Sequence, residues 1–265
     1  MNKILLSFDV EEFDLPLEYN LNLSKEEQFK FSYNGLKKVL DLLEKQEKQA
    51  TFFVTASFAS KYPQIIRNIA KTHEIASHSL HHQVKEYNEK ETKLSKEIIE
   101  KIINKSIQGF RFPRLKKVDY NSLKKIGFKY SSSISPTYIP NRYNNYFEKR
   151  KITLRNQVFE IPISTTQIIH IPFSWIFFRF LGKNYSKIAT ISCMKNPGFT
   201  NLFFHPWEFN DLKPFKIPFY IRRNSGPQAL KMLQDYMFWC KKKKYEFMTF
   251  GEFLNTHPQK PTNHP

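Results

Sequence analysis

Short apolar runs of strand length alternate with amphipathic helical patterns along most of the chain, and this alternation is the feature that most constrains its fold. Residues 3–8 and 50–54 are two such runs. Between them, Ser24-Lys25-Glu26-Glu27 forms a capping box that predicts a helix reaching about Lys45. The alternation predicts repeated β/α units on a mostly parallel sheet. Further strands are expected at residues 74–77, 107–112, 128–132, 158–163 and 201–204, and further helices after Pro63, around Leu94, from Asp119 to Gly127 and from Pro227.

About seven β/α units in 265 residues predict a single barrel-like domain related to the eight-unit (β/α) barrel. Residues 136–158 are polar and are expected to form a long irregular insertion. We expect the domain to span residues 1–255 and residues 256–265 to form a loose tail. In such barrels the catalytic groups gather at the C-terminal ends of the strands.

Composition excludes several classes of protein. The chain is 40% apolar and 25% charged, which argues against disorder, and its two cysteines cannot form a disulfide framework. No signal peptide and no membrane-spanning stretch are expected, so we predict a cytoplasmic protein. The formal net charge of +18 favours anionic partners in general. Nucleic acid is not expected, because Lys241-Lys242-Lys243-Lys244 lacks interleaved aromatic residues.

Polar residues follow four of the expected strands, and in a barrel such positions converge. They are Asp9-Val10-Glu11-Glu12, the pair His78 and His82, Arg111 and His205. The two histidines of the pair are four residues apart, so on a helical turn their imidazoles would face the same way and could share a metal ion. His73 and His81 are expected to lie outside such a site.

A three-ligand metal site needs a carboxylate besides two imidazoles, and the acidic cluster after the first strand can supply it. A second carboxylate would then accept a proton from metal-bound water, and Arg111 would keep that carboxylate ionised. A protonated His205 would suit a leaving amine. Together these groups predict metal-assisted hydrolysis of an amide or ester.

Four motifs occur in the same order as in a known family. Phe8-Asp9-Val10-Glu11, His78-Ser79-Leu80-His81-His82, Arg111-Phe112-Pro113 and Leu202-Phe203-Phe204-His205-Pro206 resemble the motifs of the polysaccharide deacetylases, the family 4 carbohydrate esterases. The resemblance implies a distorted (β/α)7 barrel and a divalent metal, most often zinc, that serves to remove N- or O-acetyl groups from sugars. It also implies His78 and His82 as metal ligands, Asp9 as the base, Arg111 as its tether and His205 as the acid.

Two positions depart from the family pattern. Val10 stands where the family usually has a ligand Asp. We assign that ligand to Glu11, because the Asp-Val-Glu order resembles a subgroup that includes deformylases of lipid-linked amino sugars. Glu12 is a further candidate, and Asp9 as ligand with Glu11 as base is the alternative. Ser131 stands where the family often has an Asp that tunes the catalytic His, and Glu160 or Glu208 would have to replace it.

These inferences predict a metal-dependent hydrolase that removes an acetyl or formyl group from an amino sugar, a polysaccharide, or a nucleotide- or lipid-linked precursor. A metal-independent, allantoinase-like amide hydrolase on the same fold is the alternative that Val10 favours. A non-catalytic glycan- or nucleic-acid-binding module is a third. The aromatic stretch Phe173 to Phe180 is expected in the core or, alternatively, at the inner face of a membrane, where it would admit a lipid-linked substrate.

Overall fold

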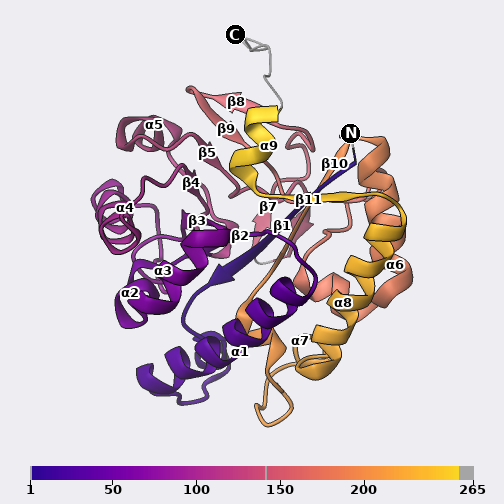
Figure 1. Ribbon diagram of the computed structural model, residues 1–265, viewed down its shortest axis with the longest axis horizontal. Helices are drawn as coiled ribbons and strands as arrows, with labels where there is room; N and C mark the ends of the chain where they lie inside the picture. The colour runs from indigo at the N-terminus through magenta and orange to yellow at the C-terminus, as the bar shows by residue number, and fades with distance from the viewer. Residues whose placement is uncertain (1, 141, 257–265) are drawn as a thin grey trace.

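A curled sheet surrounded by helices makes up the fold (Figure 1). The computed structural model describes residues 2–140 and 142–256. Within these residues the sheet has nine strands, eight of them in the order β10-β1-β2-β3-β4-β5-β9-β8, and β11 pairs with β1. The pairings are parallel except for the β8–β9 hairpin. The strands are β1 (Lys3–Val10), β2 (Thr51–Val54), β3 (Glu74–Ser77), β4 (Gly109–Phe110), β5 (Tyr130–Ser131), β8 (Thr153–Arg155), β9 (Val158–Glu160), β10 (Phe199–Phe204) and β11 (Glu246–Met248).

Alternate residues of the strands face two separate apolar layers, as the two-residue period of a strand requires. On β1, Ile4, Leu6 and Phe8 pack into the large core between the sheet and the helices. Leu5 packs into a second core inside the curl, which Phe250 helps to close. The inward face of β1 therefore carries its polar residues toward the end of the strand at which the barrel opens.

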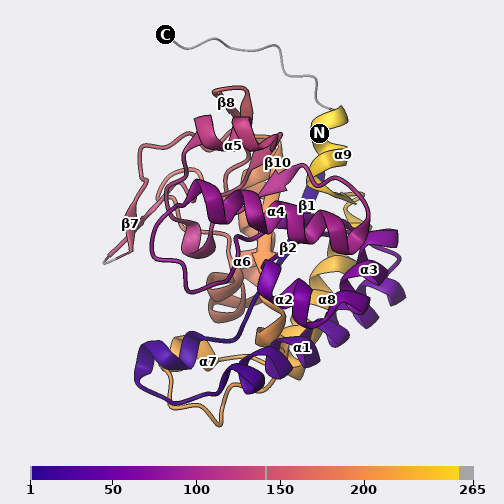
Figure 2. The same ribbon diagram turned by 90° about the vertical axis from the view of Figure 1, so that its left-hand side faces the viewer.

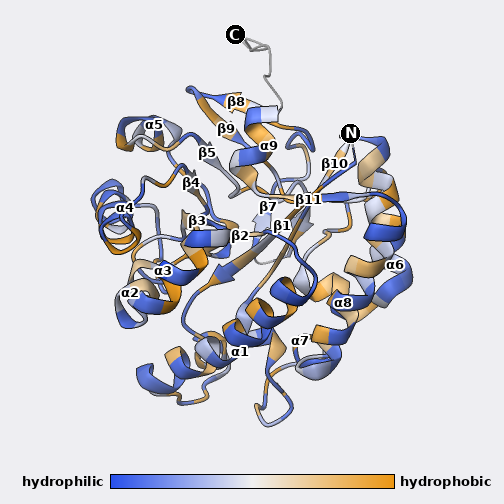
Figure 3. Ribbon diagram, in the orientation of Figure 1, coloured by the Kyte–Doolittle hydropathy of each residue, from blue (hydrophilic) through white to orange (hydrophobic). Residues whose placement is uncertain are grey.

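Helices cover the outer face of the sheet, and hydrophobic and hydrophilic residues alternate along them (Figure 3). Local signals in the sequence place several of their ends. Ser24 and Glu27 form the expected capping box, the Asp119 side chain accepts the Asn121 amide, and Gly127 ends its helix with a left-handed φ of 92°. The helices are α1 (Lys25–Lys45), α2 (Ala56–Lys61), α3 (Pro63–Thr72), α4 (Glu89–Ile103), α5 (Tyr120–Ile126), α6 (Trp175–Lys195), α7 (Phe219–Arg222), α8 (Pro227–Lys242) and α9 (Phe250–Thr256).

The distorted (β/α)7 barrel expected from the sequence is confirmed, and its distortion lies between β9 and β10. These two strands do not pair, and the side chain of Asn201 bridges the gap instead. Its amide Nδ2 donates to the carbonyls of Ile161 and Pro162 at 3.1 and 3.0 Å, and the Ser164 amide donates to the Asn201 carbonyl at 3.1 Å. The seam is thus closed by a buried side chain.

Several predicted segments differ from the structure. The insertion at residues 136–158 is not wholly irregular, because it contains β8 and the antiparallel hairpin of β6 (Tyr138–Ile139) and β7 (Tyr143–Asn144). Helices α2 and α6 and strand β11 had no counterpart in the prediction. Of the expected tail at 256–265, residues 257–265 lie outside the described residues, while Thr256 ends α9. No helix in the described part of the chain is both long and apolar enough to cross a bilayer.

Candidate metal centre and active site

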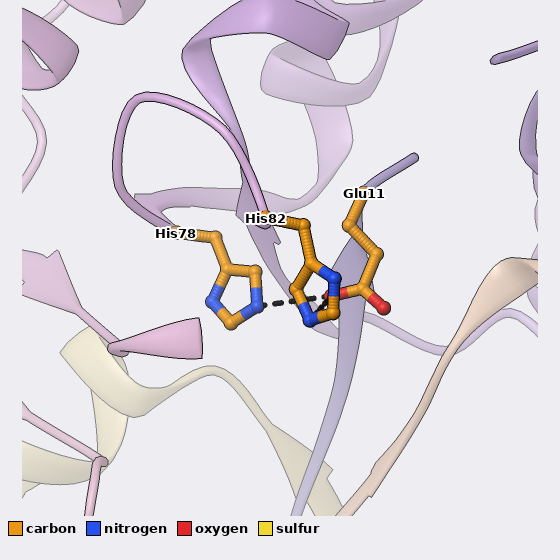
Figure 4. A group of neighbouring side chains, drawn as sticks. All are labelled: Glu11, His78 and His82. Atoms are coloured by element: carbon orange, nitrogen blue, oxygen red, sulfur yellow. Dashed lines mark hydrogen bonds and ion pairs between the residues drawn. The ribbon is translucent and has the colours of Figure 1, made fainter. Parts of the chain in front are cut away.

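Glu11, His78 and His82 meet at the C-terminal end of the sheet (Figure 4). β1 ends one residue before Glu11, and β3 ends one residue before His78. The Oε2 atom of Glu11 lies 3.1 Å from Nε2 of His78 and 3.2 Å from Nε2 of His82. All three side chains are buried, and they line a cavity of about 460 Å³. The three side chains that the sequence analysis chose as ligands therefore lie together.

The remaining ring nitrogens of both histidines are also held in place. Nδ1 of His78 lies 2.8 Å from the backbone carbonyl of Arg111, and Nδ1 of His82 lies 2.7 Å from Oδ1 of Asp14. Each acceptor favours a proton on Nδ1, so that Nε2 of each ring can present its lone pair to a cation beside Glu11. One carboxylate and two such imidazoles form the donor set of a catalytic zinc site with open positions. These residues fit a divalent metal ion.

Charges inside this buried group shift the pKa values of its members. Burial alone would raise the pKa of Glu11, but the charges of His82 and His205 and the hydrogen bond with His78 lower it to about 2. Burial likewise opposes a charge on His82, but Glu11 and Asp14 raise its pKa to about 9. In the metal-free chain at neutral pH, His82 thus carries a proton and its charge faces the Glu11 carboxylate. A divalent ion must displace that proton in order to bind.

The two histidines converge without the helical turn that the sequence analysis expected. Residues 78–82 form a loop in which Ser79 has a left-handed φ of 70°. The backbone amides of Ala56 and Ser57, at the start of α2, donate to the carbonyls of Ser79 and Leu80 at 3.0 and 2.9 Å. The helical turn was therefore wrong, and the anchoring of the loop to α2 sets the geometry of the pair.

Asp9 lines the same cavity and forms a buried ion pair with Arg111 behind it. Nη1 of Arg111 donates to Oδ1 of Asp9 at 2.7 Å and to the Ser7 hydroxyl at 3.0 Å. Nε and Nη2 of the guanidinium donate to the backbone carbonyl and the hydroxyl of Ser132, both at 2.9 Å. The guanidinium also stacks on the Phe53 ring, 4.0 Å from its centroid. Its place is therefore fixed from several directions, and its charge faces the Asp9 carboxylate.

His205 follows β10 and lies beside the three candidate ligands. Its Nε2 is 3.8 Å from Oε1 of Glu11, and its ring stacks on Trp207 with centroids 4.7 Å apart. Glu208 accepts the backbone amide of His205 at 2.7 Å and lies 3.1 Å from its Nδ1. Burial would lower the pKa of His205, but the carboxylates of Glu11 and Glu208 raise it.

Glu208 is itself held by Arg179, a fully buried residue of α6. Nε of Arg179 donates to Oε2 of Glu208 at 2.7 Å. The same guanidinium donates to the backbone carbonyls of Ile221 and Arg223 at 2.7 and 2.5 Å. One arginine thus connects the carboxylate beside His205 with α7.

Four other residues considered from the sequence lie elsewhere. Glu12 accepts hydrogen bonds from the hydroxyls of Thr55 and Ser57, so it is not part of the metal-ligand group. Glu160 accepts the backbone amides of Ser133 and Ile134, and Ser131 donates to the Ser133 hydroxyl, so Glu208 is the carboxylate beside His205. The remaining two, His73 and His81, are not among the grouped ligand atoms.

Sequence reasoning missed Asp14 and Trp207. Asp14 holds His82 although the two residues are 68 positions apart, and the indole Nε1 of Trp207 donates to Oε1 of Glu11 at 3.2 Å. The sequence contains no spacing rule for either contact, because only the tertiary fold brings the partners together. The acidic cluster that begins at Asp9 was the available signal, and it extends to Asp14.

The mouth of the cavity has one charged and one apolar side. On the charged side, Arg114 and Arg142 both approach Glu18, at 2.5 and 3.7 Å. Trp175 and its neighbours on α6 line the apolar side.

The two end residues of the aromatic stretch Phe173 to Phe180 differ from each other in exposure. Phe173 is buried in the core together with Phe178, as expected for most of the stretch, whereas Phe180 is exposed, and a membrane contact of the stretch stays a prediction.

Comparison with known proteins gives a partial match to one family model and a shared fold. Residues 29–131 match the sequence model of the polysaccharide deacetylase family. A Mycobacterium smegmatis protein assigned to the polysaccharide deacetylases is similar in structure, with a TM-score of 0.65 and 17% identity over 99% of this chain and 93% of that one. No curated protein matches the sequence.

Two further solved structures share the fold. Puue allantoinase has a TM-score of 0.65 and 16% identity, covering 97% of this chain and 92% of its own. A family 4 acetyl xylan esterase from Clostridium thermocellum, solved with a cobalt ion, has a TM-score of 0.52 and 16% identity, covering 96% and 91%. The family model thus matches residues 29–131 of this chain, and the solved structures share its barrel fold.

Proposed function

We propose that the protein is a metal-dependent hydrolase that removes an acetyl or formyl group from an amino sugar. The observation that supports this most strongly is the buried group of Glu11, His78 and His82, whose Nε2 atoms both face one carboxylate oxygen. The Nδ1 atom of His78 is held by the backbone carbonyl of Arg111, and the Nδ1 atom of His82 is held by Asp14. Metal-ligating histidines usually have this kind of support. Zinc is the ion we expect.

Asp9 is the proposed general base. A divalent ion held by the three ligands would polarise the carbonyl and lower the pKa of water toward neutrality. Arg111 keeps the Asp9 carboxylate ionised and aimed into the cavity, so that Asp9 can accept a proton from water there. The alternative assignment exchanges Asp9 and Glu11. It is weaker, because Asp9 is engaged by the Arg111 guanidinium while Glu11 approaches both imidazoles.

His205 is the proposed general acid. It lies near Glu11 and is oriented by Glu208. The Glu208 carboxylate would replace the Asp that the family often has at the position of Ser131. The raised pKa of His205 favours its protonated form near neutral pH, and a leaving amine needs that proton. The buried Arg179 orients Glu208 and neutralises its charge.

The substrate that we propose is an acylated amino sugar, in a polysaccharide or as a nucleotide- or lipid-linked precursor. The cavity of about 460 Å³ falls within the size range of small-molecule sites, and its indole and phenyl side chains suit the apolar faces of sugars. A cytoplasmic location stays a prediction, as does the expectation that nucleic acid is not a partner.

A metal-independent amide hydrolase, similar in chemistry to an allantoinase, is the second candidate. The fold likeness to Puue allantoinase and the presence of Val10 in the first motif favour it. The two candidates differ in one measurable property, because only the first requires a stoichiometric divalent ion.

Elemental analysis of the purified protein, combined with deacylase assays on free, nucleotide-linked and lipid-linked N-acyl amino sugars, tests the proposal. We expect one divalent ion per chain, and we expect His78→Ala to lose both the ion and the activity. His81→Ala is the matched control, because His81 belongs to the same loop but not to the ligand group. Full activity of the chelated protein would refute the metal-dependent reaction and favour the second candidate.

A further inference from the structure

Four exposed apolar side chains border the mouth of the cavity. Phe180 and Leu181 on α6 are 37% and 44% exposed, and Phe219 and Tyr220 on α7 are 61% and 47% exposed. The guanidinium of Arg223 lies 5.1 Å from the Phe180 ring centroid and 5.8 Å from that of Phe219, so the two helices present one continuous surface. We call these four residues the apolar rim.

The fold holds the apolar rim outward. Ile221, the next residue on α7, is buried in a satellite core with Trp207, and its carbonyl is bound by Arg179. On α6, Gly182 has a φ of 77° and a ψ of −167°, which breaks the helix directly after Leu181. Burial on one side of α7 and the break in α6 leave the apolar rim exposed next to the cavity. Figure 2 shows α7 at the lower end of the molecule, toward which β1 runs.

The surroundings of the apolar rim carry positive charge. No Asp or Glu occurs in residues 161–207 or in residues 212–234. Basic residues flank the apolar rim closely in sequence on both helices, and they are Lys183, Lys213, Lys216, Arg222 and Arg223. Of the acidic groups near these segments, Glu18 is paired with Arg114 and Arg142, and Asp235 is paired with Lys231. The Asp211 carboxylate accepts the backbone amide of Lys213.

The apolar rim is also continuous with the inner wall of the cavity. Phe180 and Tyr220 line the cavity together with Trp175, Ile176 and Phe177. Leu15 and Glu18 of the 3-10 helix η1 (Leu15–Tyr19) line the same cavity as Phe180 and Tyr220. Whatever covers the apolar rim therefore also faces the entrance to the cavity.

We propose that the apolar rim docks on the surface of a lipid bilayer that contains anionic lipids. Exposed Phe, Leu and Tyr side chains surrounded by Lys and Arg have the composition of an interfacial membrane-binding surface: the apolar groups enter the headgroup region and the cations pair with anionic headgroups. Charge complementarity identifies the occupant, because the charged residues that flank the apolar rim in sequence are basic and the nearby Glu18 is already paired with Arg114 and Arg142. Docking requires no metal ion, so the proposal does not depend on the hydrolase activity.

Cosedimentation of the full chain with phosphatidylcholine vesicles, with and without phosphatidylserine, tests the proposal. We expect binding to the anionic vesicles only, weakened by salt. The double variant Leu181→Ser and Phe219→Ser should weaken it about tenfold. Lys183→Gln and Lys216→Gln should each weaken it about fivefold. Phe147→Ser is the matched control, because Phe147 is 93% exposed and lies outside the apolar rim, and it should bind like the parent chain.

Three results would overturn the proposal: no binding to either vesicle, equal binding to both, or binding that the double variant leaves unchanged. Thermal melting of each variant shows that it is folded, and its metal content shows that the ligand group is intact. His78→Ala separates this proposal from the proposed function. If that variant loses its metal and activity but still binds vesicles, both proposals stand, whereas an unmodified protein that binds vesicles but retains no metal refutes only the hydrolase.

Discussion

The affinity of the metal-free protein for zinc should depend steeply on pH. His82 has a pKa of about 9 in the absence of metal, because Glu11 and Asp14 both stabilise its charged form against the cost of burial. An incoming ion must expel that proton. The apparent affinity should therefore rise about tenfold per pH unit, or about a hundredfold between pH 6.5 and 8.5, and level off above pH 9.

Asp14→Asn is the informative perturbation of this equilibrium. The carboxylate of Asp14 lies 2.7 Å from Nδ1 of His82 and makes the imidazole more basic toward protons and metal alike. Removing its charge should lower the pKa of His82, so that the affinity levels off at a lower pH. At high pH, where the proton no longer competes, the loss of this support should weaken zinc binding about 10- to 100-fold. Near neutral pH the difference in zinc affinity between the variant and the parent should be smaller. The reason is that a smaller fraction of His82 is protonated in the variant, so that zinc has fewer protons to displace.

Competition with a chromophoric chelator measures the affinity, and calorimetry in buffers of different ionisation enthalpy measures the proton release. Near pH 7.5 we expect about one proton per zinc ion from His82 in the parent protein. An affinity that stays constant between pH 6.5 and 8.5, or an Asp14→Asn variant with the same pH profile as the parent, would refute the reasoning.

Three further predictions follow from the buried contacts. In the metal-free chain the pKa of His82 is raised from 6.5 to about 9, so its protonation stabilises the fold by on the order of 3 kcal/mol below pH 6.5. Urea unfolding should show that this contribution disappears as the pH rises through 9. Arg179→Met should destabilise the protein by about 3–5 kcal/mol, because it removes the guanidinium partner of the buried Glu208 carboxylate, and an unchanged urea midpoint would contradict this. Gly35→Ala should cost about 1–3 kcal/mol in a thermal melt, because its Cβ would lie 1.9 Å from the Pro206 carbonyl oxygen, and a melting temperature equal to the parent's would show that α1 yields freely.

The strand ends of the barrel could be predicted from sequence because their signals are local. An apolar run followed by a polar residue marks Glu11, His78, Arg111 and His205 without reference to the rest of the chain. Since parallel strands end at the same edge, the four positions had to approach one another. The order of the motifs then gave the resemblance to the polysaccharide deacetylases, whose family model matches residues 29–131.

The parts that sequence reasoning missed depend on contacts between distant segments or on weak periodicity. Helix α6 is interrupted at Gly182 and carries apolar residues on more than one side, so it gives no clear amphipathic stripe. Strand β11 pairs with β1 over three residues, which is too short for a recognisable pattern. The contact between Asp14 and His82 joins segments 68 residues apart, and the spacing of the two histidines suggested a helix where the structure has a loop anchored to α2.

Arg179 links α7, at the entrance of the cavity, to Glu208, which holds the proposed proton donor His205. Its three nitrogens are divided between the Glu208 carboxylate and the last turn of α7, so neither partner can shift without pulling on the other. A displacement of α7 would consequently move Arg179 and Glu208, and with them the imidazole of His205. If α7 docks and His205 donates a proton as proposed, Arg179 couples the two events.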